Sequence, residues 1–290
     1  MLGDGGRGTL YRRVMNVAKP QAGHLGAPFG GTSGPLNAIT DVRGVEVGHV
    51  TFISGRHDDP TSGPVVRTGA TALHATGKGA AEGVAAGWLA LNGNGEITGT
   101  TRYDFKAGIG TASRVVAIDR DAYRVGVLVQ ANYGRRPRLR IAGVPVGAEL
   151  ADPASVVPTT GRGDGSIIVL IATDAPLLPG QLRAVAKRAS LGLGRNGSIA
   201  AHTSGDLFLA FSTANRHRYG APGPGRFAFV LTERIDPFFA ATVEATEEAI
   251  VNTMGAAEPM TGADGAFYSS LPHETLRELL RRDGRLVSTS

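Results

Sequence analysis

One apolar run, SIIVLIATDA at residues 166–175, constrains the fold of this chain most strongly. It is too short to span a membrane, and its Ile and Val content is typical of a strand that is buried on both faces. A Gly-rich stretch, GRGDG at 161–165, leads directly into it. The sequence therefore predicts a central strand that begins abruptly at Ser166.

The remaining pattern predicts a layered α+β domain. Further strands are expected at 42–53, 68–75, 89–100 (followed by glycine turns) and 115–132 (two strands around a turn). Helices are expected late in the chain, at 179–194, 236–255 and 273–282. The first should bury Leu182, Val185, Ala186 and Ala189, and the second Phe239, Val243, Thr246, Ile250 and Met254. Strands first and helices late favour α+β over a doubly wound fold.

Composition indicates a soluble globular protein with one large domain. Apolar residues make up 42% and charged residues 19% of the 290, and there is no cysteine, which excludes disulfides and thiolate chemistry. No apolar run approaches the ~18 residues of a membrane span, and residues 1–23 lack the apolar core of a signal peptide, so we expect a cytoplasmic protein. Residues 1–33 are expected to form an irregular arm, and residues 34–290 a single domain.

The candidate motifs for nucleic-acid, cofactor and metal binding lack the sequence context that such sites require. The basic run RRPRLR at 135–140 is interpreted as the turn and flank of a hairpin, without interleaved aromatic residues, so no nucleic-acid partner is expected. GLGRNG at 192–197 follows a helix rather than a strand, which argues against a dinucleotide site. The seven histidines show no ligand spacing, so neither a cofactor nor a metal is expected. Arg162-Gly163-Asp164 directly precedes the buried strand and is not interpreted as an adhesion motif.

Ser166 is a candidate nucleophile of an unusual kind. A serine needs a neighbouring base, and no histidine stands out as one. Cleavage of the bond between Gly165 and Ser166 would release an α-amine, with a pKa of ~8, within reach of the serine's own hydroxyl. Gly165 offers no side chain to obstruct the attack and tolerates strained backbone angles. The alternative is an ordinary turn before a strand, with Asp164 and Gly165 as turn residues.

Three more polar residues stand at strand ends. Ser204 and Asp206 lie two apart at the start of a strand, so both should point to one face and could orient the amine of a nucleophile. Asn132 ends the strand in VLVQANYG, and its amide could donate to an oxyanion. The alternatives are a polar end of an edge strand and a turn asparagine.

Seven segments taken in order resemble one known family. They are GPLNAITDVRGVEVGHVT (34–51), VRTGATAL (66–73), LNGNGEITGT (91–100), YDFKAGIGTASRVV (103–116), GVLVQANYG (126–134), GRGDGSIIVLIATDAPL (161–177) and SGDLFLAFST (204–213). Together they resemble the L-aminopeptidase/D-esterase (DmpA-type) family of self-processing β-peptidyl aminopeptidases. The resemblance implies an αββα sandwich akin to ornithine acetyltransferase and a hydrolase with an N-terminal nucleophile.

The resemblance also implies an activity and a division of roles. The chain would cleave itself into residues 1–165 and 166–290, release N-terminal amino acids from short peptides, amides or esters, and form homo-oligomers of processed pairs. By position, Ser166 would be the nucleophile and Asn132 part of the oxyanion hole. Ser204 and Asp206 would support the nucleophile's amine, although some relatives carry Glu where this chain has Asp206.

One departure from the family pattern affects the substrate pocket. After Thr100 the chain continues directly into TRYDFKAGIGT (101–111), where the family carries several tens of further residues. That segment would include a Glu-Thr-aromatic-Asp-Gly run, which the family uses for the substrate's amine and for the oxyanion. Two interpretations of this departure remain open: an active aminopeptidase, or a member that folds, with or without self-cleavage, but is catalytically impaired.

Overall fold

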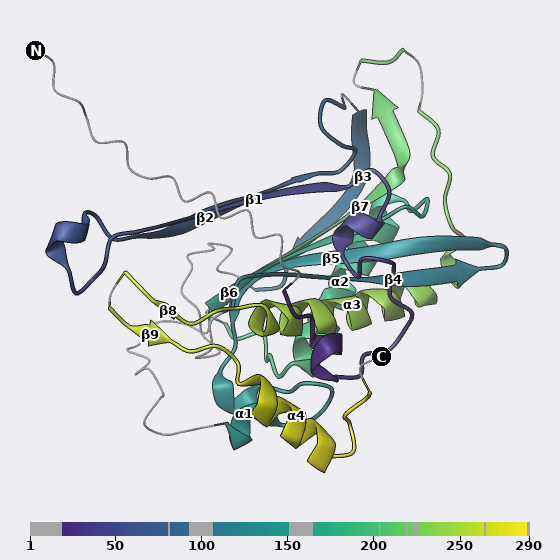
Figure 1. Ribbon diagram of the computed structural model, residues 1–290. Helices are drawn as coiled ribbons and strands as arrows, with labels where there is room; N and C mark the ends of the chain where they lie inside the picture. The colour runs from purple at the N-terminus through teal and green to yellow at the C-terminus, as the bar shows by residue number, and fades with distance from the viewer. Residues whose placement is uncertain are drawn as a thin grey trace, which may run out of the picture.

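A computed structural model of the chain describes residues 19–80, 82–92, 107–150, 165–202, 204–218, 220–222, 225–263 and 265–288. Its centre is a five-stranded sheet (Figure 1). In spatial order the strands are β3 (Glu82–Ala90), β7 (Gly205–Arg218), β6 (Gly165–Thr173), β5 (Asp121–Tyr133) and β4 (Ile109–Ile118). β6 and β7 run parallel, and the other neighbours are antiparallel. The predicted apolar strand is therefore the middle strand of a mixed sheet.

The two faces of β6 are buried to different degrees. Ile167, Val169 and Ile171 are fully buried toward the main core, whereas Ile168 and Leu170 on the opposite face are only half-buried. The prediction of a strand buried on both faces is thus correct for one face and only partly correct for the other. Period-two alternation alone could not have separated the two cases, because both faces carry apolar side chains.

Two helices, α2 (Pro179–Arg195) and α3 (Asp236–Gly255), pack side by side against the sheet and against each other (Figure 1). The predicted face of α2 is confirmed, because its four apolar residues are all buried. The predicted stripe of α3 is wrong at one position. Phe238 is fully buried, whereas Phe239 is half-buried, with the Arg188 guanidinium 3.9 Å from its ring centroid. Most sides of α3 are buried, so its sequence carries little helical periodicity.

Two glycines allow α3 to lie close to β4 and to α2. A Cβ at Gly110 of β4 would lie 2.1 Å from the carbonyl oxygen of Ala249 on α3. A Cβ at Gly192 of α2 would lie 2.7 Å from Cβ of Thr246 on α3. Real Cβ atoms do not approach other atoms this closely, so these positions need glycine for space.

The face of the sheet opposite α2 and α3 carries a second, smaller apolar cluster. Its buried members are Ile39, Val42, Val45, Leu128, Ala172 and Phe211. An antiparallel ribbon of β1 (Glu46–Ser54) and β2 (Val66–His74) starts nearby and extends away from the body of the molecule (Figure 1). Most of the ribbon's side chains are exposed.

The strand expected at 89–100 was placed too late. Strand β3 covers Glu82–Ala90, and residues 93–100 lie outside the described part of the chain. The β3 sequence, EGVAAGWLA, is rich in Ala and Gly and has one β-branched residue, so propensity argued against a strand there. Tertiary pairing with β7 overrides that local preference.

Residues 19–41, which include the described part of the expected arm, pack onto the core. Ala22 and Leu25, in a short 3₁₀ turn, belong to the main cluster, and Thr32 forms a bridge with Val115 of β4. Residues 1–18 lie outside the described chain.

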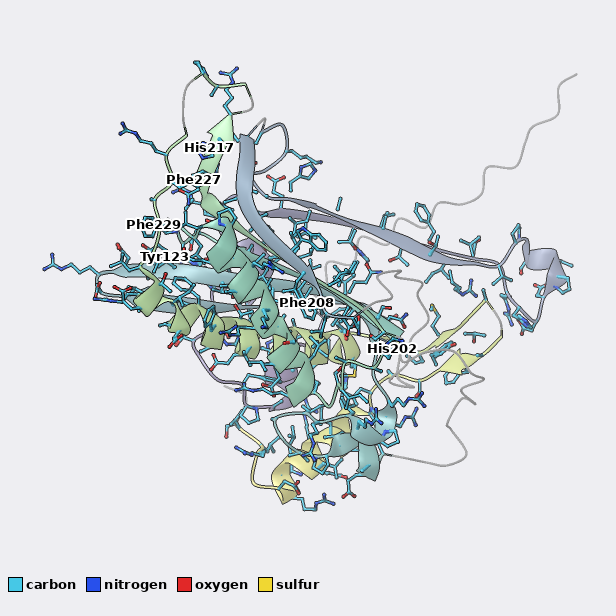
Figure 2. The ribbon with its side chains drawn as sticks, turned by 180° about the vertical axis from the view of Figure 1, so that it is seen from behind. Tyr123, His202, Phe208, His217, Phe227 and Phe229 are labelled. Atoms are coloured by element: carbon cyan, nitrogen blue, oxygen red, sulfur yellow. The ribbon has the colours of Figure 1, made fainter. Side chains whose placement is uncertain are left out.

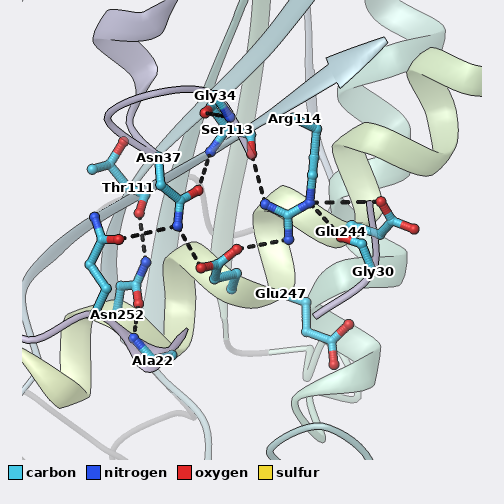
Figure 3. Close-up of polar contacts among 12 residues, drawn as sticks. Ala22, Gly30, Gly34, Asn37, Thr111, Ser113, Arg114, Glu244, Glu247 and Asn252 are labelled. Atoms are coloured by element: carbon cyan, nitrogen blue, oxygen red, sulfur yellow. Dashed lines mark hydrogen bonds and ion pairs between the residues drawn. The ribbon is translucent and has the colours of Figure 1, made fainter. Parts of the chain in front are cut away.

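A buried polar network fastens this segment to β4 and α3 (Figure 3). Arg114, 1% exposed, donates to the carbonyl oxygens of Gly30 (2.6 Å) and Ser113 (2.7 Å) and pairs with Glu248 at 2.7 Å. Asn37 donates to the second oxygen of Glu248 at 2.6 Å. The buried cation is thereby matched by an anion and by carbonyl oxygens, which a charge needs away from water.

Four short elements complete the described fold, one in the middle of the chain and three near its C-terminus. They are α1 (Val146–Glu149), β8 (Met260–Thr261), β9 (Phe267–Tyr268) and α4 (His273–Arg282), the last as predicted. The interpretation of 135–140 as a hairpin flank is wrong: β5 ends at Tyr133, and Arg136–Arg138 form a 3₁₀ turn in which Arg136 is buried. No helix in the described part of the chain has the length and apolarity to cross a bilayer.

Candidate active site

Ser166 occupies the start of the central strand, where the sheet brings two other chain segments beside it. Its Cα is paired with that of Asn132 on β5 and with that of Gly205 on β7. Its side chain is buried, and its Oγ accepts a hydrogen bond of 3.1 Å from the backbone N–H of Gly205. Residues 132, 166 and 205 thus form one row across three strands.

The residue before Ser166 has an unusual backbone. Gly165 has a φ of +84°, in the left-handed region where glycine is favoured and other residues are strained. Residues 151–164, including Arg162-Gly163-Asp164, lie outside the described chain. The backbone at the Gly165–Ser166 junction is therefore held in a conformation that depends on glycine.

Ser204 and Asp206 flank Gly205 on the other side. The Ser204 hydroxyl donates to Oδ1 of Asp206 at 2.6 Å, and both side chains are buried. The two-residue spacing thus brings the hydroxyl and the carboxylate together, as expected. Since the intervening Gly205 donates to Ser166, the pair begins one residue away from the candidate nucleophile.

The environment of Asp206 raises the pKa of its carboxyl group. Burial is the main cause, because it disfavours the charged form. Hydrogen bonds from Ser204, from Asn92 and from the backbone of Ile167 act in the opposite direction and lower the pKa. Ile167 directly follows Ser166, so these donors include the backbone beside the candidate nucleophile.

Asn92 is a site residue that the sequence analysis missed. It is the second residue after β3, donates to Oδ2 of Asp206 at 3.1 Å, and accepts a 2.8 Å hydrogen bond from the backbone N–H of Asp206. The two residues are 114 apart in the chain. The only sequence signal for Asn92 was a polar residue shortly after a strand. That signal became informative only with the pairing of β3 and β7.

Asn132 places an unpartnered amide next to Ser166. The residue is 7% exposed, and neither its Nδ2 nor its Oδ1 has a hydrogen-bond partner among the described residues. Such orphaned buried groups are rare in folded proteins. Asn132 and Ser166 are directly opposite each other in the sheet, so both side chains project to the same face.

Two hollows differ in their relation to this site. A small recess is lined by Ser204 together with Gly134, Arg135, Arg138, Gly197, Ser198, Ile199 and Ala201. A larger cavity of about 510 Å³ is lined by Arg43, Ala122, Tyr123, Asp174, Thr213, Ala214 and Arg216. The larger one lies beyond the far end of β6, so it does not include the candidate residues despite its size.

Figure 2 shows His202 near the start of β7 and His217 at its other end. No histidine there forms a hydrogen bond with Ser166, and no group of three or more His, Asp or Glu residues that could hold a metal ion is found among the described residues.

The chain is similar to known proteins over most of its length. Its sequence matches the profile of peptidase family S58 over residues 37–103 and 98–268. This chain belongs to peptidase family S58. It is 35% identical to the β-peptidyl aminopeptidase BapA of Sphingosinicella microcystinivorans over 385 residues, covering 97% of both chains. It is 36% identical to BapA of Sphingosinicella xenopeptidilytica over 374 residues, covering 92% of both.

Solved structures agree with the sequence comparison. A protein from Pyrococcus horikoshii OT3 has a TM-score of 0.82 at 33% identity, covering 92% of this chain and 100% of its own. The L-aminopeptidase D-Ala-esterase/amidase of Ochrobactrum anthropi, a variant of the Ntn hydrolase fold, has 0.82 at 33%, covering 93% and 100%. A Burkholderia sp. β-aminopeptidase has 0.79 at 32%, covering 91% and 99%.

These comparisons confirm the predicted family and the predicted DmpA-type Ntn hydrolase fold, and the described residues form a mixed sheet flanked by helices. They indicate that this S58 member is a hydrolase with aminopeptidase activity, for which peptides are the suggested substrates.

Proposed function

We propose that this S58 protein cleaves itself between Gly165 and Ser166 and then acts as an aminopeptidase with Ser166 as its N-terminal nucleophile. The observation that carries the proposal is the row formed by Asn132, Ser166 and Gly205, with the Ser204–Asp206 pair around its end. Next to Ser166 are thus an unpartnered amide on one neighbouring strand and, on the other, a hydroxyl–carboxylate pair that flanks Gly205.

Self-cleavage uses the Ser166 hydroxyl against the preceding carbonyl. As Oγ bonds to the Gly165 carbonyl carbon, the C–N bond to Ser166 breaks and the nitrogen takes up the hydroxyl proton. Water then hydrolyses the resulting ester, which leaves a carboxylate on Gly165 and an α-amine on Ser166. A glycine at position 165 leaves the carbonyl accessible and allows the positive φ.

Turnover uses the α-amine that cleavage releases. With a pKa of ~8, part of the amine is neutral near pH 7 and accepts the hydroxyl proton as Oγ attacks a substrate carbonyl. The Asn132 amide donates to the developing oxyanion, and the proton passes to the leaving amine or alcohol. Water then releases the N-terminal amino acid. Ser204 and Asp206 hold the Ser166 amine in position. The proposed substrates are short peptides and aminoacyl amides or esters.

We also propose that this chain lacks a family segment after Thr100. Its alignment with the first BapA relative spans 385 residues, which is longer than the whole chain of 290. The family match also divides into two pieces that meet at 98–103. The impaired-enzyme alternative has less support, because family membership favours aminopeptidase activity and the four proposed catalytic residues lie together.

Intact-mass spectrometry with an activity assay tests the proposed function. We expect the wild-type protein to yield fragments 1–165 and 166–290 and to hydrolyse aminoacyl anilides. Ser166→Ala should remain one chain and be inactive. Ser190→Ala is the matched control and should behave as wild type, because within the described part of the chain Ser190 donates only to the Lys187 carbonyl on α2. An uncleaved wild-type chain whose turnover survives Ser166→Ala would refute the proposal.

A further inference from the structure

Asn92 is the side chain that anchors Asp206 from the neighbouring edge strand. We propose that Asn92 is a positioning residue that keeps the Asp206 carboxylate ionised and directed toward Ser204. This inference rests on the proposed function, because Asp206 supports the Ser166 amine only in that reaction. Asn92 does not contact the reacting atoms itself and acts through Asp206.

The contacts of Asn92 determine which way its amide faces. Its Oδ1 accepts from the backbone N–H of Asp206 at 2.8 Å, and its Nδ2 donates to Oδ2 of Asp206 and to the Ala201 carbonyl, both at 3.1 Å. In a flipped amide, the NH2 group would face the Asp206 N–H, and the oxygen would face two acceptors, Oδ2 of Asp206 and the Ala201 carbonyl. Asn92 therefore presents an N–H to the carboxylate.

The two oxygens of Asp206 have different donors. Oδ1 accepts from Ser204, and Oδ2 accepts from Asn92. The Asp206 side chain is 1% exposed, so water cannot replace a lost donor without rearrangement. Without Asn92, Oδ2 would lose this donor, which favours the protonated acid. The plane of the carboxylate would also be less restrained, so its hold on Ser204 would weaken.

Hydrogen bonds, rather than a neighbouring cation, keep Asp206 charged in the described part of the chain. Burial raises the pKa of Asp206, and the influences that lower it are the donors Ser204, Asn92 and the backbone of Ile167. The cationic side chains Arg135 and Arg138 line the recess to which Ser204 also contributes. Cleavage adds the Ser166 amine. The N–H of Asn92 is therefore one of the three hydrogen-bond donors that favour the ionised form of Asp206.

The sign of the pH effect follows from the proposed reaction. The active form has Asp206 ionised and the Ser166 amine neutral, so both groups have lost their protons. Any change that strengthens proton binding at Asp206 then moves the acid limb of the pH–rate profile to higher pH. A purely structural loss at Asn92 would lower activity at every pH and leave the limb in place.

Asn92→Asp tests the donor with little change in shape. The variant keeps an oxygen for the Asp206 N–H, but it replaces the N–H donor with a second carboxylate oxygen. We expect the acid limb of kcat to move up by at least about one pH unit, because Asp206 loses a hydrogen bond to its charged form and gains a like charge beside it. KM should change little, and Asn92→Gln, which retains the donor, should show a smaller shift.

Asn215→Asp is the matched control on β7. The Asn215 amide makes the same reciprocal pair with a backbone, donating to the Ala228 carbonyl at 2.9 Å and accepting from the Ala228 N–H at 3.1 Å. Among the described residues, the Asn215 side chain has no hydrogen bond with a titratable group, so the acid limb should stay where it is in wild type. A limb that moves equally in both variants would overturn the inference.

A titration separates this inference from the proposed function. With ¹³C-labelled aspartate, NMR can follow the Asp206 carboxyl carbon, which Asp206→Asn identifies. We expect a higher Asp206 pKa in Asn92→Asp than in wild type, whether or not the protein turns over substrate. An unchanged pKa overturns the role of Asn92 even in an active enzyme. An inactive, uncleaved wild type would instead refute the proposed function.

Discussion

Asn132 illustrates a conflict between stability and chemistry at the scale of one residue. Both of its side-chain polar atoms are buried without a partner among the described residues. Leaving a buried polar group unsatisfied costs about 1–3 kcal/mol. Residues that break a local rule of folding are frequently functional, and an amide donor without a partner is what an oxyanion needs.

We therefore expect Asn132→Ala to separate activity from stability. The kcat for an aminoacyl anilide should fall about 10²–10³-fold, as for loss of one oxyanion donor. The melting temperature should stay unchanged or rise, because the variant removes unsatisfied polar atoms. Asn252→Ala is the comparison: its amide accepts from Ala22 and donates to Thr111, so its loss should lower the melting temperature. A strongly destabilised Asn132→Ala would contradict this interpretation.

At the scale of elements, the contact between β4 and α3 depends on a missing side chain. Gly110 lies against the backbone of Ala249 and Thr253, so the strand and the helix approach more closely than a Cβ allows. The same helix carries Glu248, which pairs with Arg114 of β4. Moving α3 outward would therefore strain an ion pair as well as the apolar packing.

Gly110→Ala should destabilise the protein by about 1–3 kcal/mol, the usual effect of overpacking a core. The midpoint of urea unfolding, measured together with the m-value, gives this number. Gly48→Ala on the exposed ribbon is the matched control, because a Cβ there meets nothing within 4 Å, and its midpoint should be nearly unchanged. Equal midpoints for the two variants would show that α3 adjusts without strain.

At the scale of the whole molecule, the sheet has one well-covered face and one sparsely covered face. Trp88 of β3 is 67% exposed and is paired with Leu209 of β7, which is half-buried, as is Leu170 beside it on β6. Alternation along β6 places Leu170 on the same face as Ser166. The sparsely covered face thus carries both these apolar side chains and Ser166.

Trp88 is the single tryptophan of the chain and reports directly on this face. We expect dilute protein to show red-shifted emission that acrylamide quenches efficiently, because the indole is in water. If copies of the chain associate through this face, emission should shift to the blue with rising protein concentration. A blue-shifted emission that is independent of concentration would show that the chain covers Trp88 itself, contrary to its described exposure.

The sequence by itself determined the elements whose signal is local. The apolar run predicted β6, helical periodicity predicted the buried face of α2, and a two-residue spacing predicted the contact between Ser204 and Asp206. These follow from periods of 2.0 and 3.6 residues, which are properties of short segments. The family's seven motifs added the fold and the class of activity.

Only the tertiary structure decided which segments become neighbours. The parallel pairing of β6 with β7 brings the Gly205 N–H to Ser166 across 39 residues, and β3 brings Asn92 to Asp206 across 114. It also overrode the weak strand propensity of β3 and made one face of β6 more buried than the other. Such outcomes depend on the free energy of packing between distant segments, which the pattern of one short segment does not reveal.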